Sequence, residues 1–125
     1  TFNRDNSQRD VAALEILQDT DIGIGVFGST TFWAGDKEIY VARDGSLAKN
    51  YEKAKIQLNP VAMNEYIPDN QSNQRLGTIM HEIGHALGLT HRNHTPGSIM
   101  CQYGYGRMVW RPSASDCYAV NHLYP

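Results

Sequence analysis

The 125-residue sequence predicts a single α+β domain. Three observations indicate this class. Short β-favouring segments bounded by turn residues occupy the first half, a long helical pattern covers residues 73–87, and a second helical pattern closes the chain at residues 113–124. No internal repeat, low-complexity tract or long linker divides them. We therefore expect one domain over residues 1–125, large enough for a hydrophobic core.

The first half is expected to hold one helix and three strands. Ser7 can cap a helix that runs to about Gln18, since the apolar residues between them have helical spacing. Three later segments favour β structure and are bounded by turns, at residues 21–27, 38–42 and 54–58. Pro60 and Pro68 bracket the connection that follows. The second half is then mainly helical.

The helical pattern over residues 73–87 has two different faces when it is plotted at about 100° per residue. One face is an apolar stripe that we expect to pack in the core, formed by Leu76, Ile79, Met80, Ile83 and Leu87. His81 and His85 lie together on the opposite side, among small residues. Gly88 stands where a left-handed residue ends many helices. The pattern predicts a helix that lines a cleft, and a turn that brings His91 back toward the other two imidazoles.

The residues from His81 to His91 read H-E-x-x-H-x-x-G-x-x-H, a spacing typical of a catalytic zinc site. Three imidazoles suit one Zn²⁺, and a catalytic site keeps the fourth position for water. Glu82 follows His81 and is expected beside that zinc-bound water, as the base that takes its proton and passes it to the leaving amine. The motif predicts hydrolysis of a polarised carbonyl, most simply the peptide bond of a peptide or protein substrate.

Two further histidines compete with His91 for the role of third ligand. The turn at Gly88 favours His91, whereas His94 is expected to be a solvated loop residue and His122 a structural residue of the last helix. After Glu82 the chain contains no other glutamate. This excludes the class of sites in which a downstream glutamate is the third ligand.

Charge and hydropathy argue against two kinds of partner. The formal net charge is -2 with both signs mixed along the chain, which gives no electrostatic case for nucleic acid or an anionic membrane. No segment reaches the roughly 18 apolar residues that span a bilayer.

The chain starts at Thr1 without a signal peptide or an initiator methionine. We expect a mature or trimmed form from which a leader or pro-segment has been removed.

The residues around this motif resemble the metzincin metalloendopeptidases, and the matrixins in particular. Residues 81–91 are similar to the matrixin sequence H-E-F-G-H-A-L-G-L-D-H, residues 96–100 (P-G-S-I-M) to P-G-A-L-M, and residues 113–124 to the closing helix. The resemblance implies that Met100 is the Met-turn residue, a hydrophobic floor under the histidines. The alternative is an ordinary core methionine.

The resemblance also implies a fold and a mode of binding. The metzincin fold, of α/β/α type, would place a twisted, mostly parallel sheet and two helices in an upper subdomain at about residues 1–90. A smaller, irregular lower subdomain would follow at about residues 91–125 and end in the last helix. Substrate would bind extended along an edge strand. The alternatives are a non-catalytic zinc-binding module, and a latent peptidase inhibited by a pro-segment or by self-association.

Several positions depart from the matrixin pattern. No histidine precedes His81, so the additional structural zinc of matrixins has no ligands, and no calcium site is assigned. Arg92 replaces the usual serine after the third histidine, and Gln102 begins a segment that replaces the P-x-Y wall of the specificity pocket. Tyr103 and Tyr105 either reach substrate and oxyanion or, as we favour, form the pocket wall.

The chain has two cysteines, Cys101 and Cys117. We favour a disulfide between them, which would contribute about 3 kcal/mol in a loop of that length. A bridge would agree with a secreted, extracellular protein. The alternative is two reduced thiols that pack as small apolar residues.

Overall fold

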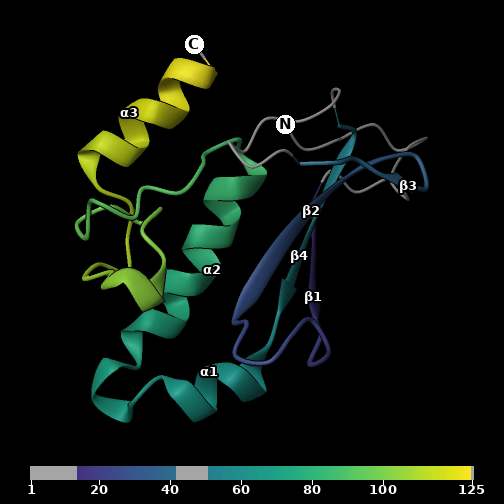
Figure 1. Cartoon of the computed structure of the whole chain (residues 1–125). Coiled ribbons are helices and arrows are strands. Elements are labelled where there is room, and N and C mark those ends of the chain that lie inside the picture. The colour runs from purple at the N-terminus through teal and green to yellow at the C-terminus, as the bar shows by residue number, and fades with distance from the viewer. Residues whose placement is uncertain (1–13, 42–50, 125) are drawn as a thin grey trace.

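The computed structural model describes residues 14–41 and 51–124. Within these ranges the α+β class is confirmed (Figure 1). The elements are β1 (Leu14–Gln18), β2 (Gly28–Ala34), β3 (Lys37–Glu38), β4 (Lys53–Leu58), α1 (Pro60–Tyr66), the 3₁₀ turn η2 (Asp69–Gln71), α2 (Asn73–Ala86), the 3₁₀ turn η3 (Tyr103–Tyr105) and α3 (Ala114–Leu123). None of the helices in these ranges is long and apolar enough to span a membrane.

The four strands form one sheet in the order β1-β4-β2-β3. β1 runs parallel to β4, whereas β2 is antiparallel to both β4 and β3. The sheet is therefore mostly antiparallel, not mostly parallel as the resemblance implied. One physical reason is the two-residue turn at Gly35 and Asp36, because strands joined by so short a connection can pair only in antiparallel fashion.

The expected N-terminal helix is wrong where the structure describes it. Residues 14–18 of that segment form β1, and residues 7–13 lie outside the described residues. Over so few residues the apolar side chains fit a period of two as well as a period of 3.6. Pairing with β4, which sets Leu14 opposite Ala54 and Ile16 opposite Ile56, selects the strand.

The expected strand at residues 21–27 is also wrong, because this segment consists of turns. Gly23 and Gly25 have φ of 138° and 72°, values in which the backbone leaves the extended conformation. The strand begins instead at Gly28, and it was not predicted. β3 reaches only Glu38, so the strand expected at residues 38–42 is shorter than predicted and its last residue lies outside the description.

The remaining elements agree better with the sequence. β4 and the long helix α2 are confirmed, and so is α3, whose capping box joins Ser113 and Asp116. Helix α1 replaces the expected connection after Pro60. The side chain of Asn59 accepts a 3.1 Å hydrogen bond from the backbone nitrogen of Ala62, so the signal for this helix was an N-cap followed by proline.

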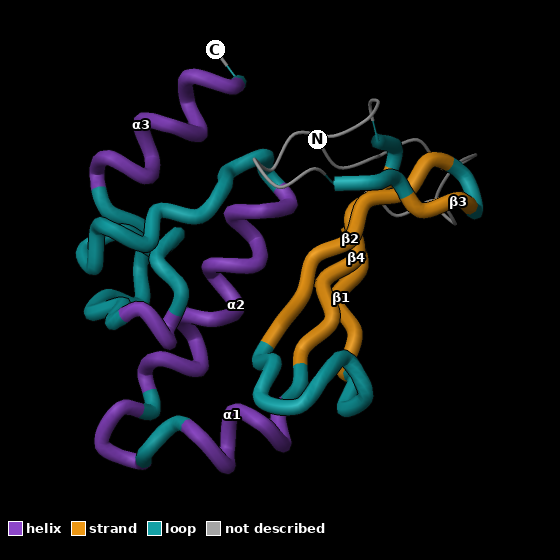
Figure 2. Tube along the Cα trace, viewed as in Figure 1, coloured by secondary structure: helices purple, strands orange, loops and turns teal. Residues whose placement is uncertain are grey.

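Helix α2 lies between the sheet and the irregular segment that leads to α3 (Figure 2). It packs against β2 and β4. The core on this side consists of Phe32, Ile39, Ala54, Ile56 and Ala86. The apolar stripe of α2 is only partly buried, since Leu76 and Leu87 are 46% and 37% exposed. Because α2 is covered from two directions, its small and polar face is buried instead, including Gly77, Thr78, His81 and Glu82.

The two cysteines are free, so the disulfide we favoured is wrong and the alternative of two thiols holds. Cys101 is buried beside Met100, whereas Cys117 is exposed on α3. The two side chains therefore face different surroundings, which keeps the sulfur atoms from bonding.

Candidate metal centre and its cleft

His81, His85 and His91 converge on one point. The Nε2 atom of His85 lies 3.1 Å from Nε2 of His81 and 3.1 Å from Nε2 of His91. The four-residue spacing on α2 places the first two side by side, and the chain after the helix returns the third. Within the described ranges no fourth histidine, cysteine or carboxylate belongs to this group. The arrangement leaves one side open, as a catalytic zinc site requires.

Gly88 makes the return of His91 possible. With φ of 101° it ends α2 in the left-handed conformation. Its N–H donates to the carbonyl of His85, and the N–H of Leu89 donates to the carbonyl of Gly84, the two bonds of a Schellman motif. The same turn sets the carbonyl oxygen of Leu89 at 2.8 Å from Nδ1 of His85. One glycine thus ends the helix and orients a neighbouring imidazole.

The loop before α3 orients the first imidazole. The carbonyl oxygen of Ile99 lies 2.8 Å from Nδ1 of His81. Met100, which is fully buried, follows it, and its sulfur packs against Gly84 so closely that a Cβ at that position would collide with Sδ. Met100 therefore forms a floor against the helix between the two histidines. The need for a glycine at residue 84 was not recognised from the sequence.

The tautomers of these imidazoles indicate what the centre can hold. A carbonyl oxygen only accepts, so Nδ1 of His81 and of His85 carries the proton and each Nε2 presents a lone pair. Such lone pairs 3.1 Å apart repel unless a cation lies between them. Zinc–nitrogen bonds of 2.0–2.1 Å in a tetrahedron separate the ligand nitrogens by about 3.3 Å. The donor set therefore fits a zinc ion.

Burial also favours the neutral form of His81 and His85, the form that binds metal. It lowers the pKa of His81 to about 3, with a further contribution from His85. Burial likewise lowers the pKa of His85, which the bond to the Leu89 carbonyl opposes in part, and that of His91. The centre is thus arranged for cation binding at neutral pH.

Glu82 is held from the neighbouring strand. The hydroxyl of Thr30, on β2, donates a 2.7 Å hydrogen bond to Oε1 of Glu82. A Cβ at Gly28 would lie 2.9 Å from Cγ of Glu82, so this glycine leaves room for the carboxylate. Burial raises the pKa of Glu82, while the bond from Thr30 and the positive charge of Arg107 lower it in part. These contacts hold the carboxylate in a fixed, buried position on α2 next to His81.

A cavity of about 500 Å³ opens beside His81 and Glu82. Its walls include Tyr103 and Tyr105, together with Val26, Phe27, Gly28, Tyr66, Thr78, Gln102 and Arg107. The rings of Phe27 and Tyr103 lie 5.7 Å apart, and the hydroxyl of Tyr103 donates to Oε1 of Gln71. Both tyrosines therefore stand in the wall of this cavity, as favoured from the sequence.

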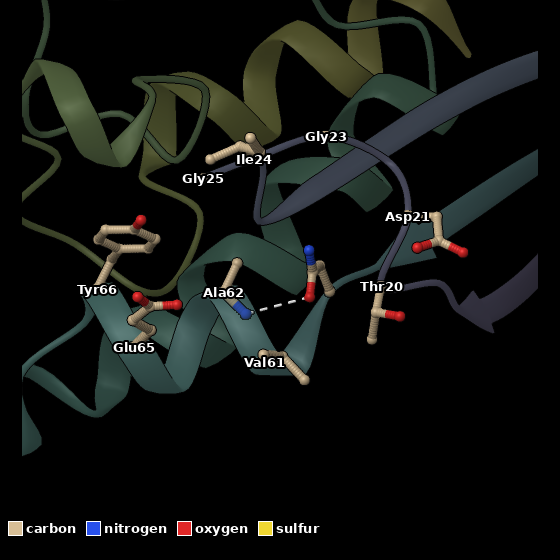
Figure 3. Close-up of a pocket in the computed structure, with 10 residues that line it drawn as sticks. Thr20, Asp21, Gly23, Ile24, Gly25, Val61, Ala62, Glu65 and Tyr66 are labelled. Carbon is tan, nitrogen blue, oxygen red and sulfur yellow. Dashed lines mark hydrogen bonds between the residues drawn. The ribbon is translucent and has the colours of Figure 1, made fainter.

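A second cavity, of about 370 Å³, lies between α1 and the turns at residues 20–25 (Figure 3). Gly25 and Tyr66 line both cavities. The two cavities are therefore neighbours, and the larger one reaches His81.

A buried carboxylate supports the loop that carries Ile99 and Met100. Asp116 is 1% exposed and accepts hydrogen bonds from the Ser98 hydroxyl at 2.5 Å, the Ile99 nitrogen at 2.8 Å and the Ser113 nitrogen at 2.9 Å. Arg92 approaches it to 3.4 Å. Asp116 is also the third residue of α3 and belongs to the capping box of that helix. Arg92, the residue after His91 at which the chain departs from the matrixin pattern, therefore contacts α3.

The other sequence alternatives lie apart from the centre. His94 is exposed in a loop and His122 is exposed on α3, and neither belongs to the histidine group.

Three residues near the centre were not predicted from the sequence, namely Gly28, Thr30 and Arg107. Thr30 and Gly28 belong to a strand that the sequence analysis did not predict, and Arg107 follows the irregular segment, so no spacing rule marked any of the three.

Comparisons with known proteins agree with this geometry. The family model for matrixins matches residues 7–125, a range that includes the histidines, Met100 and the closing helix. No curated protein and no solved structure matches the chain. Because the family match spans nearly the whole sequence, the chain belongs to the matrixin family, a family of zinc metallopeptidases.

Proposed function

We propose that the chain is a zinc-dependent endopeptidase in which His81, His85 and His91 hold the metal and Glu82 is the general base. One observation carries the proposal. Nε2 of His85 lies 3.1 Å from Nε2 of both His81 and His91, next to a buried carboxylate and an open cavity. A purely structural zinc site would instead close with a fourth protein ligand.

Zinc at this position would polarise the substrate carbonyl and lower the pKa of a water molecule to about 7. Glu82 then accepts a proton from the attacking water and gives it to the amine that leaves. Thr30 holds one oxygen of the carboxylate, Oε1, and leaves Oε2 free for this transfer. Peptide-bond hydrolysis follows from these roles.

We infer that an extended peptide binds along β2. Among the described residues, the edge of β2 that faces away from β4 is paired with β3 only at Trp33 and Ala34. The start of the strand, at Gly28, lines the cavity beside Glu82. Main-chain pairing along this edge would deliver a scissile bond to the histidines.

The proposal is tested with the purified chain, one equivalent of zinc and a quenched-fluorescence peptide library. We expect cleavage that a chelator abolishes and zinc restores. Glu82→Gln should retain zinc and lose at least about 10³-fold in kcat, because base and proton donor are lost together. Glu38→Gln, at an exposed position on β3, is the matched control and should remain active.

The alternative function is a non-catalytic or latent zinc-binding module that retains the matrixin shell. Stoichiometric zinc without cleavage of any library peptide, at every protein concentration, would favour the non-catalytic module. Activity that rises on dilution would indicate inhibition by self-association. Residues 1–125 would in either case form one domain divided near residue 90, and we place it outside the cell, in keeping with its family.

A further inference from the structure

Arg107 lies in the wall of the cavity beside His81 and Glu82. Its side chain is only 5% exposed. Gly77, on α2, provides the space, because a Cβ there would lie 3.2 Å from both Nε and one terminal nitrogen of the guanidinium. The wall of the cavity therefore contains a buried positive charge.

All the hydrogen-bond acceptors of this guanidinium are neutral. Nε donates to Oε1 of Gln74 at 2.8 Å, and one terminal nitrogen donates to the Gln74 carbonyl at 3.2 Å and the Thr78 hydroxyl at 3.0 Å. The other terminal nitrogen has only a long contact, 3.5 Å from the carbonyl of Cys101. Across residues 14–41 and 51–124, no carboxylate lies within ion-pair distance of Arg107.

A buried charge without a counterion is costly for the fold. Burial lowers the pKa of Arg107 only to about 10, so the guanidinium remains charged at neutral pH. Gln74 and Thr78 fix its orientation but supply no negative charge. The terminal nitrogen with the long contact is the donor of the fork whose hydrogen-bonding capacity is least used.

The remaining walls suit the stem of such a side chain. Phe27, Tyr66 and Tyr103 line the cavity with aromatic surface, and their rings contact one another through Phe27. A methylene stem could cross this surface and place its carboxylate at the cation. Glu82 is the one carboxylate in the lining, and its charge is opposed by the cation expected at the histidines.

The position of Glu82 identifies which substrate residue enters. Glu82 lines this cavity together with His81, whereas His85 and His91 do not. If Glu82 protonates the leaving amine, the residue that contributes that amine must lie beside it. This step rests on the proposed function. The side chain that enters the cavity is then that of the residue following the cleaved bond.

We propose that Arg107 makes this cavity select an acidic side chain, glutamate or aspartate, on the substrate residue that follows the cleaved bond. The test compares quenched peptides that differ only at that residue, which is Glu, Gln or Leu. For the unmodified chain we expect kcat/KM for the Glu peptide to exceed that for its Gln isostere by at least about tenfold. Equal rates, or preference for Gln or Leu, would overturn the proposal.

Variants separate recognition from packing. Arg107→Met should remove the preference for Glu over Gln, and Arg107→Lys should keep part of it, since the charge remains without the fork. Arg111→Met, at an exposed position outside the cavity lining, should leave the preference intact. If Arg107→Met does not fold, the Glu-to-Gln ratio of Arg107→Lys decides: a ratio below that of the unmodified chain supports the proposal, and an unchanged ratio contradicts it.

A binding measurement keeps this proposal distinct from the proposed function. Fluorescence anisotropy with the same peptides and the metal-free chain, in chelator, requires no catalysis. Tighter binding of the Glu peptide than of the Gln peptide, reduced in Arg107→Lys and abolished in Arg107→Met, supports acidic selection even if no peptide is ever cleaved. Equal binding of the two peptides, together with equal cleavage where cleavage occurs, rejects it.

Discussion

The hydroxyl of Thr30 donates a 2.7 Å hydrogen bond to Oε1 of Glu82 and also lies 3.1 Å from the carbonyl oxygen of the same residue. Fifty-two positions separate the two residues in sequence. The contact joins β2 to the helix that carries the histidines. It holds the carboxylate from the sheet side, so the position of the base depends on the strand as well as on the helix.

Removing this hydroxyl should leave the proposed base poorly positioned without removing the metal. Thr30→Val preserves the branched shape but leaves the carboxylate without its donor, a loss of about 1.5–3 kcal/mol for a bond to a charged group. We expect kcat to fall by roughly 10- to 100-fold while zinc affinity stays the same. Thr30→Ser retains the hydroxyl and should recover most of the activity. Loss of zinc in Thr30→Val, measured by equilibrium dialysis, would contradict this interpretation.

Gly28 supplies a steric test of the same base. In Gly28→Ala the new Cβ would lie 2.9 Å from Cγ of Glu82, closer than such atoms approach. The carboxylate must shift, so kcat should drop by at least tenfold, or about 1.4 kcal/mol. Gly97→Ala is the control, because a Cβ there has no neighbour within 4 Å. Equal activities of the two variants would show that the base tolerates the shift.

The sequence predicted the centre more completely than the scaffold. Ligand spacing, the Gly88 turn and the cap of α3 are local features, and local features are readable from the sequence. The formation of β1 and β2 depends on pairing with β4. This pairing joins residues that are far apart in the sequence, so neighbouring residues in the chain reveal little about it. Over five to seven residues, helical and extended periodicities cannot be distinguished without the partner strand.

The same cause explains why some residues of the site were not predicted from the sequence. Thr30 reaches Glu82 only because β2 crosses beside α2, and Arg107 reaches Gln74 only because an irregular segment folds back. No periodic pattern in the sequence indicates either contact. The partial exposure of the apolar stripe of α2 was not predicted, because a helical wheel shows which residues share a face, but not which neighbours cover that face.

The cysteines give a chemical test of the loop around Met100. Cys117 is exposed and should react promptly with a thiol reagent, whereas Cys101 is buried, and burial raises the pKa of its thiol. We expect one thiol to be modified in the folded chain and two in urea. Cys117→Ser should remove the rapid phase. If neither thiol reacts before reduction, the two cysteines are joined in a disulfide and the assignment of free thiols is wrong.

Asp116 should control stability in a pH-dependent manner. Burial alone would raise its pKa, but the hydrogen bonds from Ser98, Ile99 and Ser113 outweigh burial and lower the pKa below its ordinary value. A carboxylate with a lowered pKa in the folded state stabilises the fold above its unfolded pKa of about 3.9, and this stabilisation is lost as the pH falls through the folded value. Asp116→Asn should therefore cost about 2–4 kcal/mol of unfolding free energy at pH 7.

The difference between the unmodified chain and Asp116→Asn, measured by urea unfolding of the metal-free proteins, should remain constant from pH 7 to about pH 5 and shrink below about pH 4. Protonation of the histidines also destabilises the fold on acidification, but it affects both proteins alike and cancels in the difference. Asp36→Asn, in an exposed turn, controls for loss of a surface charge. A difference that grows on acidification would mean that the pKa of Asp116 is raised in the folded state. Such a result would remove Asp116 as the anionic support of the loop under His81.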